Sequence, residues 1–220
     1  MINILSASNS LVSEFIKEMR DVNLQKDRMR FRKNAYRLGE IFAYEISKRL
    51  EWNNVEVTTP FGLAQANELK EQPVIASILR AGLPMHDGML SFFDKADNAF
   101  ISAYRKDNGR GGFDIKIEYV SNPDLENRVL ILCDSMVATG MSMVKTYKEL
   151  IAKGKPSHTH FVSIIASTQG LDYFRKNINT TDYTVWLGVL DEELTAKSFI
   201  VPGLGDAGDL SFGSKGFEEL

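Results

Sequence analysis

Cysteine is almost missing from this sequence of 220 residues, which contains only Cys133. A single cysteine cannot form an internal disulfide, so a small scaffold held together by disulfides is excluded. The first ten residues, "MINILSASNS", lack the long apolar run of a signal peptide or a membrane span, and we therefore expect a cytoplasmic protein with no membrane partner. At position 133 we expect a small buried hydrophobic side chain and not a nucleophile.

The sequence also lacks a strong net charge. Its 26 basic and 29 acidic residues give a formal charge of -3 at pH 7, which provides no electrostatic reason for broad binding to nucleic acid or anionic lipid. Any phosphate ligand must therefore be held by local groups. The basic residues between positions 20 and 33 are interspersed with acids. They form either a solvated helix face, which we favour, or a site for an anion or a partner chain.

Three familiar kinds of site are missing as well. The histidines, His86, His158 and His160, have no third metal ligand nearby in the sequence, so we expect no metal set. We expect His158 and His160 on the surface and a structural or solvent role for His86. No Gly-x-Gly-x-x-Gly opens a helix after a strand, which argues against a dinucleotide-dependent enzyme, and the Gly-Lys-Ser/Thr ending of a P-loop is also missing.

The hydrophobic pattern predicts an α/β fold. With 220 residues, of which 44% are hydrophobic, the chain can bury one substantial core, and we expect a single domain over residues 1–220. Residues 8–49 have apolar side chains at helical spacing. From residue 55 onward, short apolar runs such as "VIASIL", "VLILC" and "HFVSIIA" alternate with helical segments. This alternation predicts a mainly parallel open sheet flanked by helices on both faces.

One segment departs from this alternation. Residues 106–120, "KDNGRGGFDIKIEYV", begin with a run that contains three glycines and continue with strictly alternating apolar and polar side chains. This pattern predicts a β-hairpin that projects from the sheet. Its glycines at residues 109–112 are the candidate for a lid over a site from which water must be excluded.

The stretch "VLILCDSMVATGMS", residues 129–142, has the features of a phosphate site. An apolar strand ends at Asp134, and ligands of open α/β sheets bind beyond the carboxyl ends of strands. The next helix begins near Ser142, so backbone N–H groups, the helix dipole and the hydroxyls of Thr139 and Ser142 could hold one phosphate. Gly140 lets the backbone approach the ligand closely. A phosphate beside an acid suits a ribose 5-phosphate; the alternative is a plain strand-to-helix connection with a capping serine.

Three further stretches complete a recognisable set: "ILRAGLPM" at residues 78–85, "SAYRKD" at 102–107 and "FIVPGLGDAGDLSFG" at 199–213. Together with "DSMVATGMS", they make the sequence resemble the uracil phosphoribosyltransferase family, which has the type I phosphoribosyltransferase fold. The resemblance covers nearly the whole chain, and "IVPGLGDAGD" is its most specific part.

The resemblance implies an enzyme that transfers the 5-phosphoribosyl group of 5-phosphoribosyl 1-diphosphate to uracil, giving UMP and diphosphate. It implies Mg²⁺ as cofactor, bound mainly through the substrate diphosphate and not by a set of protein ligands. The catalytic residues would be Arg80 and Arg105 at the diphosphate, together with Asp134 and Asp206. The ribose and its 5-phosphate would be bound by Asp134, Ser135, Met136, Val137, Ala138, Thr139, Gly140, Met141 and Ser142. Uracil would be enclosed in a C-terminal hood by Ile200, Gly205, Asp206 and Ala207.

The resemblance also implies partners and leaves one alternative. We expect a homodimer or higher homo-oligomer, a possible GTP activator and no nucleic acid partner. In the family's loop, Pro, Leu and Gly stand where this sequence has Ser135, Val137 and Met141, and we expect the Met141 side chain to point away from the phosphate. The alternative is a non-catalytic regulatory nucleotide-binding protein on the same fold, against which the presence of Arg80 and Asp134 argues.

Overall fold

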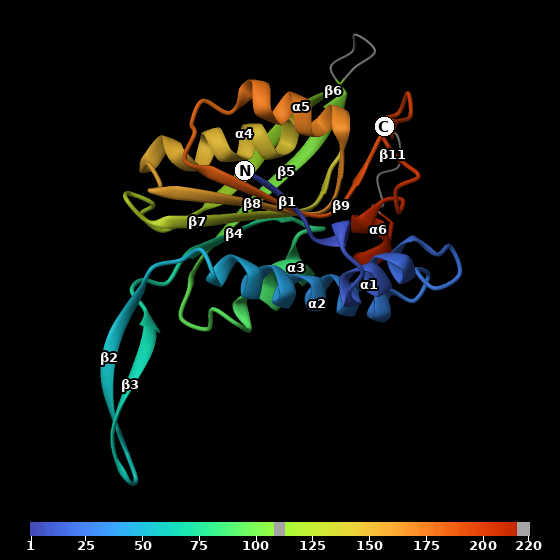
Figure 1. Ribbon diagram of the computed structural model, residues 1–220. Helices are drawn as coiled ribbons and strands as arrows, with labels where there is room; N and C mark the ends of the chain where they lie inside the picture. Colours follow the sequence, from blue (N-terminus) through green and yellow to red (C-terminus); the bar gives the residue numbers. More distant parts are fainter. Residues whose placement is uncertain (108–112, 215–220) are drawn as a thin grey trace.

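A seven-stranded sheet forms the centre of the protein in the computed structural model, which describes residues 1–107 and 113–214 except the side chains of Arg105, Asp107 and Lys153. The strand order is β1-β9-β8-β7-β4-β5-β6 (Figure 1). The strands are β1 (Ile2–Ile4), β4 (Val74–Leu79), β5 (Asp97–Asp107), β6 (Phe113–Ser121), β7 (Val129–Val137), β8 (His158–Ser167) and β9 (Tyr183–Asp191). All neighbouring pairs are parallel except β5 and β6, which confirms the predicted mainly parallel sheet.

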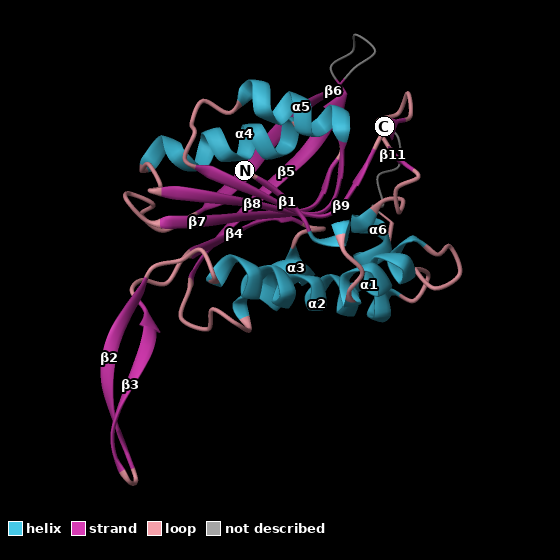
Figure 2. Ribbon diagram, viewed as in Figure 1, coloured by secondary structure: helices cyan, strands magenta, loops and turns pink. Residues whose placement is uncertain are grey.

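Helices cover both faces of this sheet (Figures 1 and 2). One face carries α1 (Leu11–Arg20), α2 (Arg28–Ser47) and α3 (Leu83–Leu90), and the other carries α4 (Met141–Leu150) and α5 (Thr168–Asn177). Short 3-10 turns lie at Leu5–Ala7 and Ile151–Lys153. None of the helices that the structure describes is long and apolar enough to cross a membrane.

Polar side chains fix the starts of three helices. The Ser10 hydroxyl accepts a hydrogen bond from the N–H of Val12 at the start of α1, and the Asp27 carboxylate accepts one from Arg30 at the start of α2. The Ser167 hydroxyl accepts one from Gly170 at the start of α5. Each bond satisfies an N–H group that has no partner within its helix, so these helix boundaries are encoded locally.

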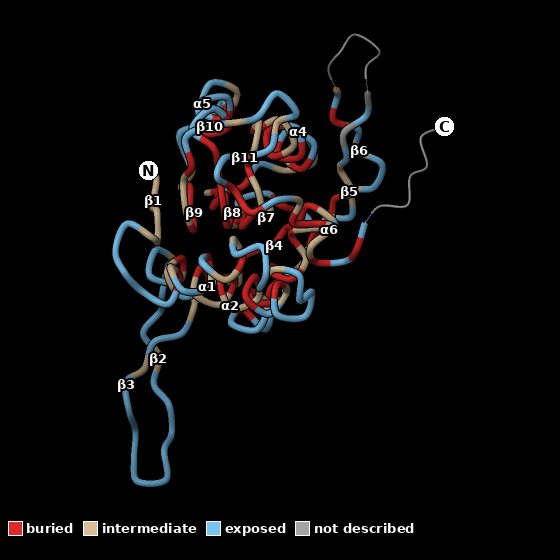
Figure 3. Tube along the Cα trace, turned by 90° about the vertical axis from the view of Figure 1, so that its right-hand side faces the viewer, coloured by how far each residue is buried: buried red, intermediate tan, exposed pale blue. Residues whose placement is uncertain are grey.

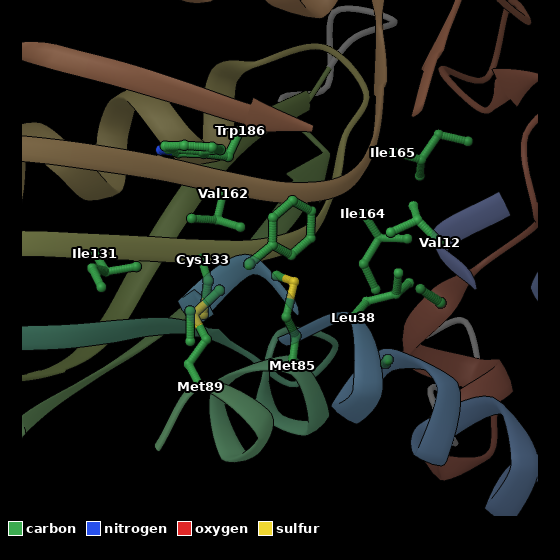
Figure 4. Packing of buried hydrophobic residues seen from close by; sticks show 14 of the residues in the cluster. Val12, Leu38, Met85, Met89, Ile131, Cys133, Val162, Ile164, Ile165 and Trp186 are labelled. Atoms are coloured by element: carbon green, nitrogen blue, oxygen red, sulfur yellow. The ribbon is translucent and has the colours of Figure 1, made fainter. Parts of the chain in front are cut away.

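The core consists of two apolar clusters, one on each face of the sheet. Figure 4 shows the cluster beneath the sheet, where Met85 and Met89 of α3 lie close to Cys133 of β7. Cys133 is fully buried, and burial raises the pKa of its thiol far above the usual range. This position confirms the prediction of a small buried hydrophobic residue.

The prediction of surface histidines is wrong for His160, whose side chain is only 2% exposed. β8 lies between β7 and β9, and helices cover both faces of the sheet, so this strand has no solvent face. The indole N–H of Trp186 donates a hydrogen bond to Nδ1 of His160 at 3.1 Å. Burial lowers the pKa of His160 to about 3, and the ring is therefore neutral at pH 7. His86 is buried as well, against Phe100.

Two β-hairpins interrupt the alternation of strands and helices along the chain. The first, β5 and β6, is antiparallel and confirms the predicted hairpin, although the candidate lid at residues 109–112 lies outside the described residues. The second, β2 (Trp52–Thr59) and β3 (Gly62–Leu69), was not predicted and stands away from the sheet (Figure 1). Thr59 pairs with Gly62, so Pro60 and Phe61 alone form its turn. Figure 3 shows this second hairpin exposed along nearly its whole length.

The C-terminal part of the chain forms a small cover beside the sheet, and Ile200, Leu204 and Ala207 pack it against the core. Strands β10 (Glu193–Leu194) and β11 (Ile200–Val201) pair with each other, and a tight turn leads from them into α6 (Ala207–Phe212). The Asp206 side chain accepts a hydrogen bond from the N–H of Asp209 and so caps α6. We call residues 200–212 the hood and residues 202–206, between β11 and α6, the hood turn.

Candidate active site

A cleft opens where β4 and β7 separate. The two strands pair from Val74 and Leu130 up to Ser77 and Cys133, after which β4 continues only with β5, up to Leu79 and Ser102. Along the chain, β4 is followed by β5 on one side, whereas β7 is followed by β8 and β9 on the other. Such a switch point between parallel strands creates a crevice at their carboxyl ends. A cleft of about 800 Å³ occupies this position.

Asp134 is the first residue of β7 beyond its last pair with β4. The prediction that the strand ends at this acid is wrong, because β8 continues to pair with β7 as far as Val137 and Ala166. Asp134 nevertheless lines the cleft, because β4 no longer pairs with β7 at this residue. The acid is therefore held on a rigid strand and not on a loop.

The loop after β7 is fixed by close backbone contacts with α5. Gly140 has φ 77°, and a Cβ atom at this residue would lie 2.4 Å from the carbonyl oxygen of Gly170. In the opposite direction, a Cβ at Gly170 would lie 2.2 Å from the carbonyl oxygen of Ala138. The Ser167 hydroxyl donates to that same oxygen at 2.6 Å. These contacts hold the backbone N–H groups at the start of α4 in place before any ligand arrives.

The start of α4 also explains how this chain accommodates Met141. The helix begins at Met141, one residue before the predicted start, and the left-handed residue is Gly140. Met141 therefore has an ordinary helical backbone, in which a long side chain causes no strain. In agreement with the expectation, Met141 does not line the cleft, whereas Thr139, Gly140 and Ser142 do. Residues 135–137 at the end of β7 and Ala138 line it as well.

Arg80 follows β4 and lines the cleft beside the hood. Its Nη2 atom lies 3.2 Å from Oδ1 of Asp209 and 3.3 Å from the carbonyl oxygen of Gly213, and the Leu79–Arg80 peptide bond is cis. About two fifths of its side chain is exposed, so the guanidinium can reach an anion in the cleft. For the second predicted arginine, Arg105, the structure describes only the backbone, in β5.

The hood forms another wall of the cleft. Gly205, Asp206 and Ala207 line it, as the resemblance predicts for the base-binding residues. Ile200 differs, because its side chain is only 4% exposed and packs into the core. Contact between Ile200 and a base would therefore need its backbone.

Several cleft residues were not predicted from the sequence. The Tyr104 hydroxyl on β5 donates to a carboxylate oxygen of Glu118 on β6 at 2.7 Å, and Lys116 donates to the same carboxylate. Hydrogen bonds from Lys116 and Tyr104 lower the pKa of Glu118. Phe199 also lines the cleft, with 45% of its surface exposed. An aromatic residue directly before "IVPGLGDAGD" was the available signal for this last position.

The fold and the cleft together define a type I phosphoribosyltransferase fold. A mainly parallel sheet, an acid at its switch point, a glycine-bearing loop at a helix N-terminus and a hood across the opening are all present.

Comparisons with known proteins identify the particular family. The sequence matches the uracil phosphoribosyltransferase family over residues 6–214. It is 51% identical over 211 residues to a uracil phosphoribosyltransferase of Porphyromonas gingivalis, covering 96% of this chain and 97% of that protein. It is 38% identical over 185 residues to one of Methanothermobacter thermautotrophicus, covering 83% of each. The chain belongs to the uracil phosphoribosyltransferase family, and the resemblance seen in the sequence is confirmed.

A solved structure agrees with the fold. The AQ2163 protein from Aquifex aeolicus superimposes with a TM-score of 0.86 at 28% sequence identity, covering 99% of this chain and 100% of that one. The match is therefore not limited to the central sheet, because it covers 99% of this chain.

Proposed function

We propose that the protein is a uracil phosphoribosyltransferase, which joins uracil to 5-phosphoribosyl 1-diphosphate and releases UMP and diphosphate. The observation that carries the proposal is that Asp134, residues 138–140 with Ser142, and residues 205–207 of the hood line one cleft in a chain of this family. The cleft thus has room for a sugar phosphate and a flat base side by side, with walls of different chemistry for each.

The sugar diphosphate binds through the β7–α4 connection in this proposal. The N–H groups at the start of α4 and the hydroxyls of Thr139 and Ser142 receive the 5-phosphate, which the helix dipole also attracts. The Asp134 carboxylate accepts hydrogen bonds from the ribose hydroxyls. Because the loop is already braced against α5, little ordering is needed when the substrate binds.

The reaction is a displacement at the anomeric carbon of the ribose. The bond to diphosphate breaks, positive charge builds on the sugar ring, and a ring nitrogen of uracil forms the new bond as its proton passes to the leaving diphosphate or to water. Arg80 and Arg105 offset the negative charge of the leaving diphosphate, to which a guanidinium fork is well suited. Water competes with uracil for the developing cation, so closure over the cleft during transfer is part of the proposal.

Mg²⁺ fits this site as a substrate-bound ion. Among residues 1–107 and 113–214, no cluster of three or more histidine, cysteine, aspartate or glutamate side chains could hold a metal ion. Mg²⁺ usually keeps several waters and binds through substrate phosphates with one or two carboxylates. Asp134 is a cleft carboxylate that could hold such an ion together with the diphosphate. When bound, the ion would neutralise charge on the leaving group.

The hood turn selects the base. Uracil offers a donor at N3 and an acceptor at O4, whereas cytosine reverses both, so a pair of backbone groups matched to uracil would meet two mismatches with cytosine. Each unpaired buried group costs about 1–3 kcal/mol, so cytosine should be poorer than uracil by roughly a hundredfold or more. We expect hypoxanthine to be excluded by its size, and orotate to be disfavoured because no residue of the turn offers a cationic partner for its carboxylate.

A substrate panel tests this proposal. Uracil, cytosine, orotate and hypoxanthine are incubated separately with 5-phosphoribosyl 1-diphosphate and Mg²⁺, and both the nucleotide and the diphosphate are measured. Rapid formation of both products with uracil alone is expected. Another base used as well as uracil would contradict the substrate, and binding of the sugar diphosphate without diphosphate release would favour the regulatory alternative.

We propose a homo-oligomer in which the β2–β3 hairpin packs against a second copy of the chain. An isolated two-stranded hairpin is only marginally stable in water. This one exposes four large apolar side chains, Trp52, Val57, Phe61 and Leu63. Phe61→Ser should lower the mass measured by sedimentation, whereas Phe92→Ser, at an exposed position away from the hairpin, should not. A monomeric wild type would refute this assembly.

Three further properties rest on family membership. We propose a single domain over residues 1–220, a cytoplasmic location and GTP as a possible activator. The activator is tested by adding GTP to the uracil assay, where an unchanged rate across the concentration range would exclude it.

A further inference from the structure

A buried acid outside the cleft has no role in the reaction described above. Asp191 is the last residue of β9, and its side chain is only 6% exposed. Arg20, the last residue of α1, binds it with both nitrogens of its fork: Nη2 lies 2.6 Å from Oδ1 and Nη1 lies 2.9 Å from Oδ2. A buried carboxylate needs such a partner, because its desolvation is otherwise costly. Pairing alone, however, does not explain the remaining contacts of these two side chains.

The ion pair also holds both backbone polar groups of Gly203, in the hood turn. The N–H of Gly203 donates to Oδ2 of Asp191 at 2.8 Å, and its carbonyl oxygen accepts from Nη1 of Arg20 at 3.1 Å. Gly203 has φ 61°, and a Cβ atom there would lie 2.1 Å from the carbonyl oxygen of Ile200. The turn is therefore tight, and the Arg20–Asp191 pair binds it at its left-handed glycine.

Gly203 lies two residues before Gly205 and three before Asp206, both of which line the cleft. Arg20 and Asp191 themselves do not line it. Other arginines contact the hood further along the chain: Arg32 donates to the carbonyl oxygen of Ser211, and Arg80 pairs with Asp209 of α6 and donates to the carbonyl oxygen of Gly213, just beyond the hood. The Arg20–Asp191 pair is thus the ion pair that holds the turn itself, among the contacts that the structure describes.

We propose that Arg20 and Asp191 are positioning residues that set the hood turn and thereby determine affinity for the base but not for the sugar diphosphate. This inference rests on the proposed function, in which the turn binds uracil. A displacement of the order of 1 Å in a binding group can cost about a hundredfold in rate. Ser167 pairs with Asp191 in the sheet through the backbone, but the loop is held by the Ser167 hydroxyl and Gly170, whereas the Asp191 carboxylate binds Arg20 and Gly203. A change confined to the carboxylate therefore leaves the contacts of the loop in place.

Three variants test the proposal by steady-state kinetics. Asp191→Asn keeps an oxygen for the N–H of Gly203 but removes the charge that pairs with Arg20, and Arg20→Lys keeps the charge but loses the fork. The matched control is Glu18→Gln, which breaks another arginine–carboxylate pair of α1, with Arg30, that has no contact with the hood.

For Asp191→Asn we expect the KM for uracil to rise tenfold or more while the KM for 5-phosphoribosyl 1-diphosphate stays within twofold. The KM of Arg20→Lys for uracil should lie between those of Asp191→Asn and the wild type, and the KM of Glu18→Gln should equal that of the wild type. An unchanged KM for uracil, or an equal rise of both KM values, would overturn the proposal, because a general loss of stability affects both substrates alike.

Hydrogen exchange provides a readout that does not depend on activity. In Asp191→Ala, the amides of residues 203–206 should exchange at least tenfold faster than in the wild type, while those of residues 138–142 remain unchanged. If this variant does not fold, Arg20→Lys takes its place. Absence of uracil transfer by the wild type would refute the proposed function alone, whereas equal exchange in wild type and variant would refute the positioning role.

Discussion

Gly140 allows the bracing of the phosphate loop to be tested by one methyl group. In Gly140→Ala, the left-handed backbone costs about 1–2 kcal/mol for a residue with a Cβ atom. The new atom would also lie 2.4 Å from the carbonyl oxygen of Gly170, where at least 3.0 Å is needed, so the loop must move by about 0.6 Å (3.0 - 2.4). A misplacement of about 1 Å can cost about a hundredfold in rate, so this shift should lower kcat/KM roughly tenfold or more.

The assay is kcat/KM for 5-phosphoribosyl 1-diphosphate at saturating uracil, with thermal unfolding measured in parallel. Gly62→Ala is the matched control: Gly62 also has a positive φ, 148°, but no atom lies within 4 Å of its hypothetical Cβ. The control should lose stability without losing kcat/KM. If Gly140→Ala folds and retains kcat/KM within twofold of the wild type, the braced loop does not bind the phosphate.

Three further changes probe other parts of the molecule. Asp134→Asn should lower kcat/KM for the sugar diphosphate tenfold to a hundredfold, since weaker acceptance of hydrogen bonds costs about 1.5–3 kcal/mol; unchanged kinetics would remove Asp134 from the site. Ser167→Ala leaves the Ala138 carbonyl without its 2.6 Å hydrogen bond, and both the melting temperature and sugar diphosphate affinity should fall, as calorimetry can show. Between pH 6.5 and about 3, His160 is protonated in the unfolded chain but not in the folded protein. The free energy of unfolding should therefore decrease as the pH is lowered, by up to about 1.4 kcal/mol per pH unit. Urea unfolding at pH 7 and 5 should show a flatter dependence for His160→Gln, and equal dependences would contradict the assignment.

The sequence allowed prediction of those elements whose signals are local. Strands β4, β7, β8 and β9 are apolar runs, and α1, α4 and α5 have apolar stripes at helical spacing. The β2–β3 hairpin was missed because its side chains are exposed on both faces, so that no apolar alternation marks it. The turn "TPFG" at residues 59–62 was its one local signal, a proline followed two residues later by glycine.

Errors arose where a property depends on which strands are neighbours. The length of β7 beyond Asp134 is set by its pairing with β8, and the burial of His160 by the central place of β8 in the sheet. Neither the strand order nor the register is encoded near these residues. The Arg20–Asp191 pair, which joins residues 171 positions apart, is hidden from sequence for the same reason.

The sequence motifs therefore identified what the cleft contains, but not what holds its walls in place. The phosphate loop is braced by α5 through Ser167 and Gly170, and the hood turn is braced by α1 and β9 through Arg20 and Asp191. These two sets of contacts share no residue. Ser167 and Asp191 are nevertheless neighbours in the pairing of β8 with β9, and the Thr168 hydroxyl donates to the Asp191 carbonyl oxygen, so the two sets of contacts are separate only in their side chains. Substitutions confined to those side chains are therefore the way to alter binding of the sugar diphosphate and binding of the base one at a time.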